Sequence, residues 1–139
     1  MVDTRFPVSV HIMTSLAHNQ PDLVSSEQLA LGIKTNASFI RKLVVSLSDA
    51  GLVESVRGKS GGIRLAKSPD EITLDQIYKA VTDSALVHIP DKTPNKSCAI
   101  SCGMGDVLNN LSKEIEENTL KQLAKKKLSE ILKLVILDK

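Results

Sequence analysis

The sequence predicts a mainly helical protein with one small β-hairpin, and two features of its patterning lead to this fold class. Apolar residues recur every three or four positions in most of the 139-residue chain, as they do in amphipathic helices. Residues 52–66 instead contain two short runs around a glycine-rich turn, which is typical of a hairpin. With 42% hydrophobic and 24% charged residues, the composition is that of a globular protein with room for one domain, or for one small domain and an appendage.

The first part of the chain carries the signals of three helices. Residues 6–18 have helical spacing of apolar side chains and precede a proline-containing break. Ser25 opens a capping-box signature for a short second helix, which we expect to stop at Gly32. Asn36 is a good N-cap for a third helix, which ends just before Gly51. Two helices joined by a short turn form a helix-turn-helix.

A hairpin and a fourth helix follow. Residues 52–57 alternate and are rich in β-branched side chains, and residues 63–66 supply the returning strand across the turn. We expect Gly62 in this turn to need a positive φ and a close approach to another backbone. Thr73 then caps a short helix. Three helices, a hairpin and a helix make a winged helix-turn-helix.

The C-terminal part predicts a linker and a long helix. We expect a DNA-binding domain over residues 1–83, a linker with two cysteines over residues 84–103 and dimerisation helices over residues 104–139. The apolar stripe of the long helix either packs back on its own domain or pairs with a second protomer. We favour the second protomer because a domain of this size offers little spare surface. The expected dimerisation residues are Val107, Leu108, Leu111 and Ile115.

Basic residues gather in one part of the chain. The net charge is +2, but residues 34–67 hold seven basic and two acidic side chains, a local charge of +5. Such a window is the expected footprint of a polyanion partner, and a solvated charged face is the alternative. Aromatic residues make up only 2% of the chain, which argues against nucleic-acid modules that stack bases on aromatic platforms.

The predicted DNA-binding residues lie on the second helix of the helix-turn-helix and on the hairpin. The start of that helix meets base edges in the major groove, where Arg41 suits guanine and Lys42 suits a phosphate. The basic hairpin suits a minor groove or phosphates. The expected contacts are Asn36, Ala37, Ser38, Arg41 and Lys42 on the helix, and Arg57, Lys59, Ser60, Gly61, Gly62 and Arg64 on the hairpin.

Two stretches of this region carry a resemblance to a known family. Residues 51–66 read GLVESVRGKSGGIRLA and residues 69–77 read PDEITLDQI. Together they resemble the signature of the bacterial Rrf-two family of transcriptional regulators, which includes regulators of iron–sulfur cluster assembly, nitric-oxide stress and cysteine metabolism. The resemblance extends over nearly the whole chain. It implies a homodimer with crossing long helices on a roughly palindromic operator, and DNA-facing positions at Ser38, Arg41, Arg57, Gly61 and Gly62.

The cysteines depart from one pattern of this family. Members that sense through an iron–sulfur cluster usually carry three cysteines before the long helix, whereas this chain has only Cys98 and Cys102. Two thiolates do not complete a four-cysteine site, and although His88 is a further candidate ligand, we expect no cofactor. If residues 98–102 are helical, the thiols share one face, which suits a thiol sensor or a soft-metal site. The alternative is two ordinary buried cysteines.

We therefore expect a sequence-specific transcriptional regulator, a repressor that binds double-stranded DNA as a homodimer and has no catalytic residues. The chain shows no secretory signal and no apolar stretch near the roughly 20 residues of a membrane span, which predicts a cytoplasmic protein without membrane contact. One alternative is a small thiol oxidoreductase using Cys98 and Cys102, although the Cys-x-x-Cys spacing is missing. The other is a winged-helix module for protein partners, against which the basic window argues.

Overall fold

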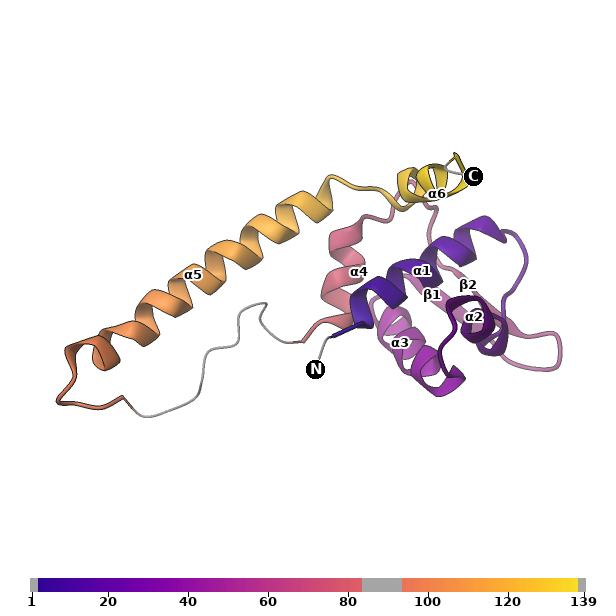
Figure 1. Cartoon of the computed structure of the whole chain (residues 1–139). Helices are drawn as coiled ribbons and strands as arrows, with labels where there is room; N and C mark the ends of the chain where they lie inside the picture. Colours follow the sequence, from indigo (N-terminus) through magenta and orange to yellow (C-terminus); the bar gives the residue numbers. More distant parts are fainter. Residues whose placement is uncertain (1–2, 84–93, 138–139) are drawn as a thin grey trace.

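The computed structural model describes residues 3–83 and 94–137, and its helices gather around one hairpin while a long helix projects from them (Figure 1). The fold class predicted above, mainly helical with a two-stranded antiparallel wing, is confirmed. The elements in chain order are α1 (Arg5–His18), α2 (Ser26–Ile33), α3 (Ala37–Asp49), β1 (Val53–Val56), β2 (Gly62–Leu65), α4 (Leu74–Val81), α5 (Ala99–Ala124) and α6 (Leu128–Leu137).

Helix α2 begins at its predicted cap but ends later than expected. The Ser25 hydroxyl accepts from the Gln28 N–H at 3.1 Å, and the Gln28 side chain accepts from the Ser25 N–H at 2.8 Å. The prediction that the helix stops at Gly32 is wrong, because the left-handed residue that ends it is Lys34, with φ 63°. Glycine usually takes that position, so a lysine there leaves no signal in the sequence. Gly32 lies inside the helix.

Helix α3 has the predicted caps. The Asn36 side chain accepts from the Phe39 N–H at 2.8 Å, and the helix ends at Asp49 before Gly51, whose φ is 76°. Its inner face packs into the core through the buried side chains of Ile40, Leu43, Val44 and Leu47. The opposite face is therefore left toward solvent.

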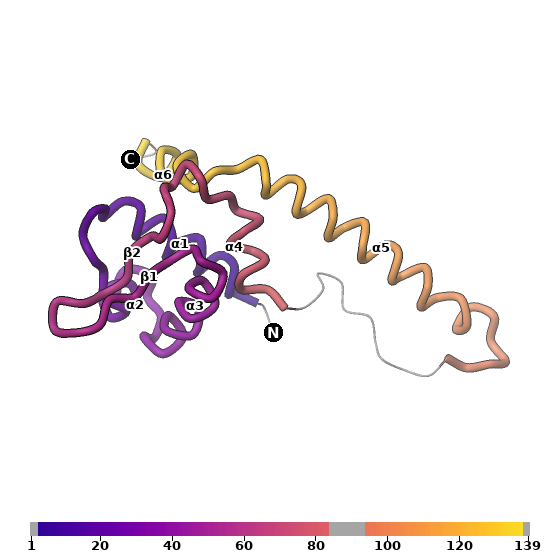
Figure 2. The backbone as a smooth tube through the Cα atoms, turned by 180° about the vertical axis from the view of Figure 1, so that it is seen from behind, coloured from indigo at the N-terminus to yellow at the C-terminus, as the bar shows by residue number. Residues whose placement is uncertain are grey.

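The wing is an antiparallel hairpin tied to the rest of the domain. Its register runs from Val53 opposite Leu65 to Val56 opposite Gly62. Val24, in the loop before α2, bonds to Ile63 in both directions, with N–O distances of 3.0 and 2.8 Å. This bridge fixes the base of the hairpin, while the turn beyond Val56 extends into solvent (Figure 2).

The chain after α5 returns to the winged domain. Leu128, at the start of α6, is fully buried in the same core as α1, α3 and α4. Its N–H donates to the Ile72 carbonyl at 2.8 Å, and the Leu74 N–H donates to the Lys126 carbonyl at 3.0 Å. Helix α6 then packs on α1. The last helix of the chain therefore packs on its own domain.

Helix α5 begins at Ala99. Its C-terminal end lies at the winged domain, and its N-terminal end lies far from that domain in both views (Figures 1 and 2). It packs against α4, and Ser112 is its one buried residue. Among the described residues, no helix is long and apolar enough to cross a membrane.

Candidate nucleic-acid interface

The outer face of α3 presents the predicted contact residues to solvent. Ser38, Arg41 and Lys42 are exposed, and Ala37 is half-buried. Asn36 is exposed too, but its side-chain oxygen is already used to cap the helix at Phe39. The structure therefore gives the Asn36 side-chain oxygen a capping role, while its exposed NH2 group takes no part in that bond.

Arg41 makes an ion pair that the sequence analysis missed. Its Nη2 donates to Oε1 of Glu27 on the first turn of α2 at 2.7 Å, and both side chains are more than half exposed. The pKa of Glu27 lies below its ordinary value because the carboxylate accepts a hydrogen bond from the backbone N–H of Glu27 itself and another from the Arg41 guanidinium. Fourteen positions separate the two residues, so only the packing of α2 against α3 brings them together.

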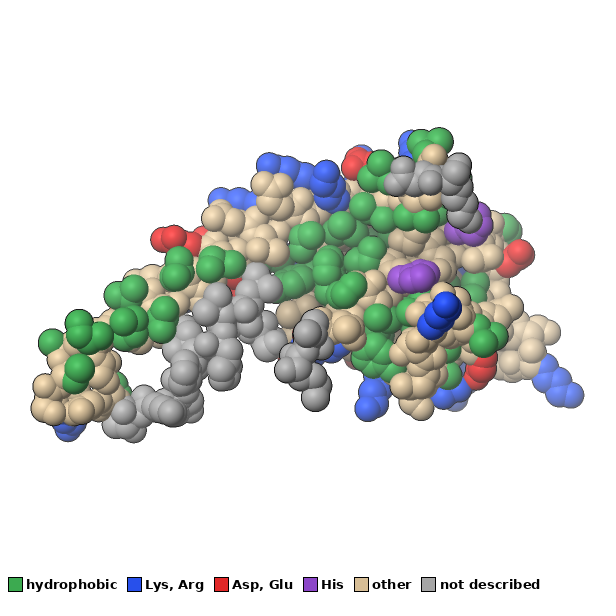
Figure 3. Space-filling view, in the orientation of Figure 1, with side chains coloured by type: hydrophobic (Ala, Val, Ile, Leu, Met, Phe, Trp, Pro, Cys, Tyr) green, Lys and Arg blue, Asp and Glu red, His purple; other side chains and the backbone are tan. Residues whose placement is uncertain are grey.

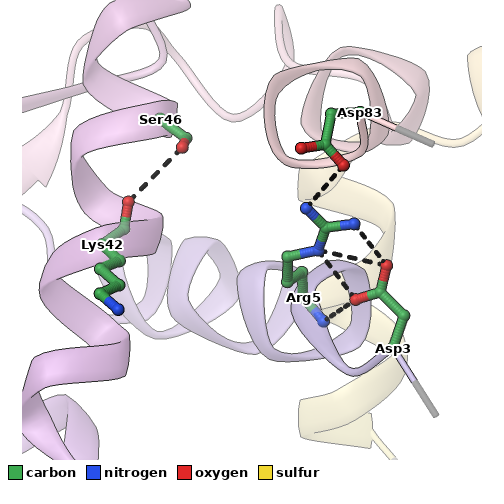
Figure 4. Close-up of polar contacts among 5 residues, drawn as sticks. All are labelled: Asp3, Arg5, Lys42, Ser46 and Asp83. Carbon is green, nitrogen blue, oxygen red and sulfur yellow. Dashed lines mark hydrogen bonds and ion pairs between the residues drawn. The ribbon is translucent and has the colours of Figure 1, made fainter. Parts of the chain in front are cut away.

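Lys42 offers a second cation on this helix. Figure 4 shows its backbone carbonyl accepting from the Ser46 hydroxyl, at 3.5 Å, while its ammonium takes part in neither this bond nor the neighbouring acidic cluster. The residues described by the structure supply no ion pair to Lys42, Lys34, Arg57, Lys59 or Lys67. Five of the seven basic residues in the window are therefore free to meet phosphates, and blue side chains gather at the lower edge and the hairpin end of the domain (Figure 3).

The cluster beside Lys42 belongs to the fold. The Arg5 guanidinium donates to Asp3 at 2.7 Å and to Asp83 at 2.9 Å, which ties the start of α1 to the end of α4 (Figure 4). The side-chain hydrogen bond from Arg5 lowers the pKa of Asp3 to about 2, and its two carboxylate partners raise the pKa of Arg5. Arg5 is thereby neutralised and is not a third phosphate ligand.

The wing carries exposed basic and small residues at its tip. Arg57, Lys59 and Ser60 are exposed. Arg64 is exposed on β2 and donates to Glu54, its cross-strand partner, at 3.0 Å. The hairpin thus presents two cations without a described partner, Arg57 and Lys59, and one paired cation.

The two glycines expected to face DNA are constrained from inside the protein. A Cβ at Gly61 would collide with the Val56 carbonyl oxygen and lie 2.9 Å from the backbone of Arg57 and Gly58. A Cβ at Gly62 would lie 3.0–3.1 Å from the loop that holds Val24. The expected positive φ of Gly62 is wrong, since Gly58 takes that conformation in this turn, with φ 111°. The close approach at Gly62 is real, but its partner is the Val24 backbone.

The two cysteines lie at the N-terminal end of α5. The sulfur of Cys98 accepts from the Ser101 N–H at 3.4 Å, and Cys98 is the N-cap rather than a residue of the first turn. Cys102 is exposed and donates to the Asn95 carbonyl at 3.4 Å. In a single chain neither thiol is buried as that alternative expects, because Cys102 is exposed and Cys98 is half-buried.

Among the described residues, the candidate metal ligands at this end of α5 are the two thiols of Cys98 and Cys102. Over residues 3–83 and 94–137, no three His, Cys, Asp or Glu side chains come together as metal ligands. His88, the further candidate ligand, lies outside the described residues. The described residues supply two thiols and no third ligand, whereas such clusters usually need four.

The predicted dimerisation residues form part of an exposed apolar stripe on α5. The exposed fractions are 61% for Val107, 46% for Leu111 and 36% for Ile115, and Leu108 is half-buried. Ile100 and Met104 extend the stripe toward the free end of the helix. Figure 3 shows this band of hydrophobic side chains along the projecting part of α5.

Comparison with known proteins gives concordant results. A family described as "Rrf2: Iron-dependent Transcriptional regulator" matches residues 2–134. The HTH-type transcriptional regulator NsrR of Oceanobacillus iheyensis is 32% identical over 143 residues, covering 98% of this chain and 95% of the relative. NsrR of Bacillus subtilis is 30% identical over 135 residues, covering 91% of each.

Solved structures share the fold. The structure of T. potens IscR has 24% identity and a TM-score of 0.71, with 97% of this chain and 88% of that chain covered. The structure of CymR, the global cysteine regulator of B. subtilis, has 21% identity and a TM-score of 0.67, with 96% and 97% covered. At these identities the likeness is one of fold.

Proposed function

We propose, for a chain that belongs to the Rrf2 family of transcriptional regulators, that it binds an operator of two inverted half-sites as a homodimer in the cytoplasm and represses the adjoining genes. As a member of that family, the chain is a transcriptional regulator with a DNA-binding fold and not an enzyme. The observation that carries the proposal is the outer face of α3. It exposes Ser38, Arg41 and Lys42 beside a basic wing, which is the arrangement that reads a major groove.

The apolar surfaces of the chain support the homodimer. Besides the stripe on α5, a groove of about 400 Å³ lies between α1 and α6. Its apolar wall is α6, through Ile131, Leu132, Val135 and Ile136. A monomer leaves both surfaces in water, where contiguous apolar surface of this kind marks an interface.

One pairing of two copies would cover both surfaces. A helix of 26 residues is roughly 39 Å long, and α6 follows directly after its C-terminal end. If two copies of α5 cross antiparallel, the free end of each lies beside the α1–α6 groove of the other. Such an interface is isologous and closes with two copies, which agrees with an operator of two inverted half-sites. We therefore assign dimerisation to residues 104–139 together with the start of α5.

Repression follows from occupancy. Two recognition helices held on one side of the duplex place a dimer in successive major grooves. When the operator overlaps a promoter, the bound dimer excludes the polymerase.

We also propose that the chain senses oxidants through its thiols and works without an iron–sulfur cluster. Cys102 is exposed and Cys98 accepts an amide N–H at a helix N-terminus, which is a setting in which reactive cysteines occur. Cys102 lies on the helix assigned to dimerisation, and Cys98 caps it. Oxidation there would alter the distance between the two recognition helices and thereby the affinity for the operator.

Selection of DNA from a genomic library tests the main proposal. Fragments bound by the purified protein should share two inverted half-sites whose centres lie one helical turn, or a multiple of it, apart. Deleting one half-site should lower the affinity to the level of unrelated DNA. Enrichment of single half-sites, or no enrichment, would contradict the proposal.

A further inference from the structure

We propose that Glu27, on the first turn of α2, is a specificity-determining residue that positions Arg41 for base readout and suppresses its binding to phosphates. This inference rests on the proposed function and assigns a role to a residue outside the recognition helix. The observation behind it is the 2.7 Å ion pair between Glu27 Oε1 and Arg41 Nη2.

The backbone that carries Glu27 is held in place by the structure around it. Glu27 lies between Ser25 and Gln28, whose reciprocal hydrogen bonds fix the first turn of α2. At the other end of α2, the Thr35 N–H donates to the Ala30 carbonyl at 3.0 Å and fixes the turn into α3. Glu27 therefore meets Arg41 from a backbone that is rigid relative to the recognition helix.

The pair is placed for recognition rather than for folding. Both side chains lie on the outside, with 55% of Arg41 and 65% of Glu27 exposed, and exposed pairs of this kind contribute little to stability. Stabilising the fold therefore does not explain why a glutamate lies at this position. The same exposure places the guanidinium where α3 enters a major groove.

The hydrogen-bond geometry leaves Arg41 able to read a base. A guanidinium carries five N–H donors in a rigid plane, and the contact with Glu27 uses one of them. Bidentate recognition of guanine needs two of the remaining four. Fixing one edge of the plane limits the directions in which the other edge can point, which favours one base position over others.

The negative charge of Glu27 lowers the affinity of the protein for DNA other than the operator. An unpaired arginine on a DNA-facing helix binds any phosphate, and such contacts supply most non-specific affinity. On unrelated DNA the carboxylate competes with phosphates for the Arg41 guanidinium, whereas on the operator the bidentate contact to a base uses the donors that the pair with Glu27 leaves free. Specificity is the difference between the two affinities, so Glu27 raises it by lowering the non-specific one.

The variant Glu27→Gln tests the role, because it removes the charge and keeps the shape. Affinity for the selected operator and for unrelated DNA is measured by fluorescence anisotropy over a salt series. We expect tighter binding to unrelated DNA, with a salt slope steeper by roughly one phosphate contact per subunit. The ratio of operator to unrelated affinity should fall by at least about fivefold, and the preference at the base pair that Arg41 reads should relax.

A matched control separates position from charge. Glu54 is also exposed, at 51%, and pairs with Arg64 at 3.0 Å on the wing, so Glu54→Gln removes the same charge near the same interface. It should strengthen binding to all DNA and leave the preference at the Arg41 base pair unchanged. In an Arg41→Ala background, Glu27→Gln should relax that preference no further, because the residue that it positions is gone.

Each contrary outcome identifies what is wrong. If Glu27→Gln keeps the wild-type ratio and base preference while Arg41→Ala loses them, the positioning role is wrong and the proposed interface stands. If Glu54→Gln lowers the ratio and the preference as much as Glu27→Gln does, the effect is one of charge alone and the inference fails. If Arg41→Ala also changes nothing, the interface itself is misplaced. Thermal unfolding of each variant should match that of the wild-type protein.

Discussion

We expect base readout at this interface to depend on Arg41, because it places the one guanidinium on the outer face of α3. Replacement by alanine should weaken operator binding by about 1–3 kcal/mol and relax the preference at one base pair in each half-site. Binding titrations on a set of single-base operator variants measure both effects. Lys113→Ala, which removes an exposed cation from α5, is the control and should change neither. Unchanged affinity in Arg41→Ala would move the interface away from this face of α3.

Lys59 differs from Arg41 in what it should recognise. It lies at the exposed tip of the wing beside flexible glycines, with no described partner, and a lysine there acts as a point charge toward phosphate. Lys59→Ala should weaken binding to operator and unrelated DNA by the same factor and reduce the salt slope by about one charge per subunit. Affinities over a range of salt concentrations give that slope. A loss confined to the operator would instead make Lys59 a base-reading residue.

Cys98 and Cys102 are the residues on which an oxidant response should depend. We expect the purified protein to show no iron–sulfur absorption, since the described residues supply only two cysteine ligands. Peroxide should weaken operator binding in the wild-type protein and leave a variant with both Cys98→Ser and Cys102→Ser unaffected. Stoichiometric iron and sulfide after anaerobic reconstitution would contradict the first expectation. Loss of DNA binding by the double variant on peroxide treatment would contradict the second.

At the scale of elements, the wing depends on a backbone that only glycine allows. The collision that a Cβ at Gly61 would make is with the Val56 carbonyl, and a backbone atom cannot move aside as a flexible side chain would. Gly61→Ala should therefore lower the free energy of unfolding by about 1–3 kcal/mol and weaken DNA binding through a distorted turn. Chemical denaturation and operator titration measure the two effects.

Gly32→Ala is the matched control for the wing. Gly32 lies within α2 and a Cβ there meets nothing within 4 Å, so alanine should stabilise the protein by about 0.5–1 kcal/mol. Equal behaviour of the two alanine variants would mean that the turn relaxes around a side chain at residue 61.

The elements that could be predicted from the sequence are those whose ends are marked by local chemistry. Ser25 and Asn36 cap their helices through side-chain oxygens, and Gly51 takes the left-handed conformation that its position requires. Lys34 ends α2 in the same conformation without a glycine, so the boundary was missed. Such a boundary is set by the turn into α3 and not by the residue that occupies it.

In the candidate site too, some features could be predicted from local patterns in the sequence and others could not. The exposed face of α3 follows from helical spacing, because burying Ile40 and Leu43 turns Arg41 outward. The pairing of Arg41 with Glu27, the use of Asn36 as a cap and the contact of Gly62 with Val24 depend on how separate elements pack. Spacing along one element carries no information about those contacts.

At the scale of the whole molecule, the N-terminal part of α5 lies away from the winged domain and α6 lies against it. Helix α5 carries its apolar stripe away from the core, and α6 returns through the buried Leu128. The domain therefore holds α5 only at its base, and a second copy is what would hold its free end. The distance between two recognition helices would then be set by α5, which makes this helix the element through which a signal at the cysteines could reach the DNA.

The dimer prediction is tested by charging the stripe. Leu111 and Ile115 are 46% and 36% exposed in one chain, so glutamate at both positions should leave the monomer folded. Burying each side chain in a dimer is worth roughly 1.5–3 kcal/mol, and two buried carboxylates add a further cost. The double variant should sediment as a monomer and lose operator affinity, whereas Asn109→Glu with Asn110→Glu, at exposed polar positions of the same helix, should remain dimeric.

The groove between α1 and α6 gives the second half of that test. Val135 is 53% exposed and lines the groove, so Val135→Glu should dissociate the dimer although it lies far along the chain from the stripe. Sedimentation velocity of both variants distinguishes the arrangements, because helices that pair only with each other would tolerate a charge at residue 135. A well-folded dimer of the Leu111→Glu, Ile115→Glu variant would place the interface elsewhere. Dissociation by both changes is expected only if the free end of each α5 lies on the partner's groove, since that contact joins the two surfaces.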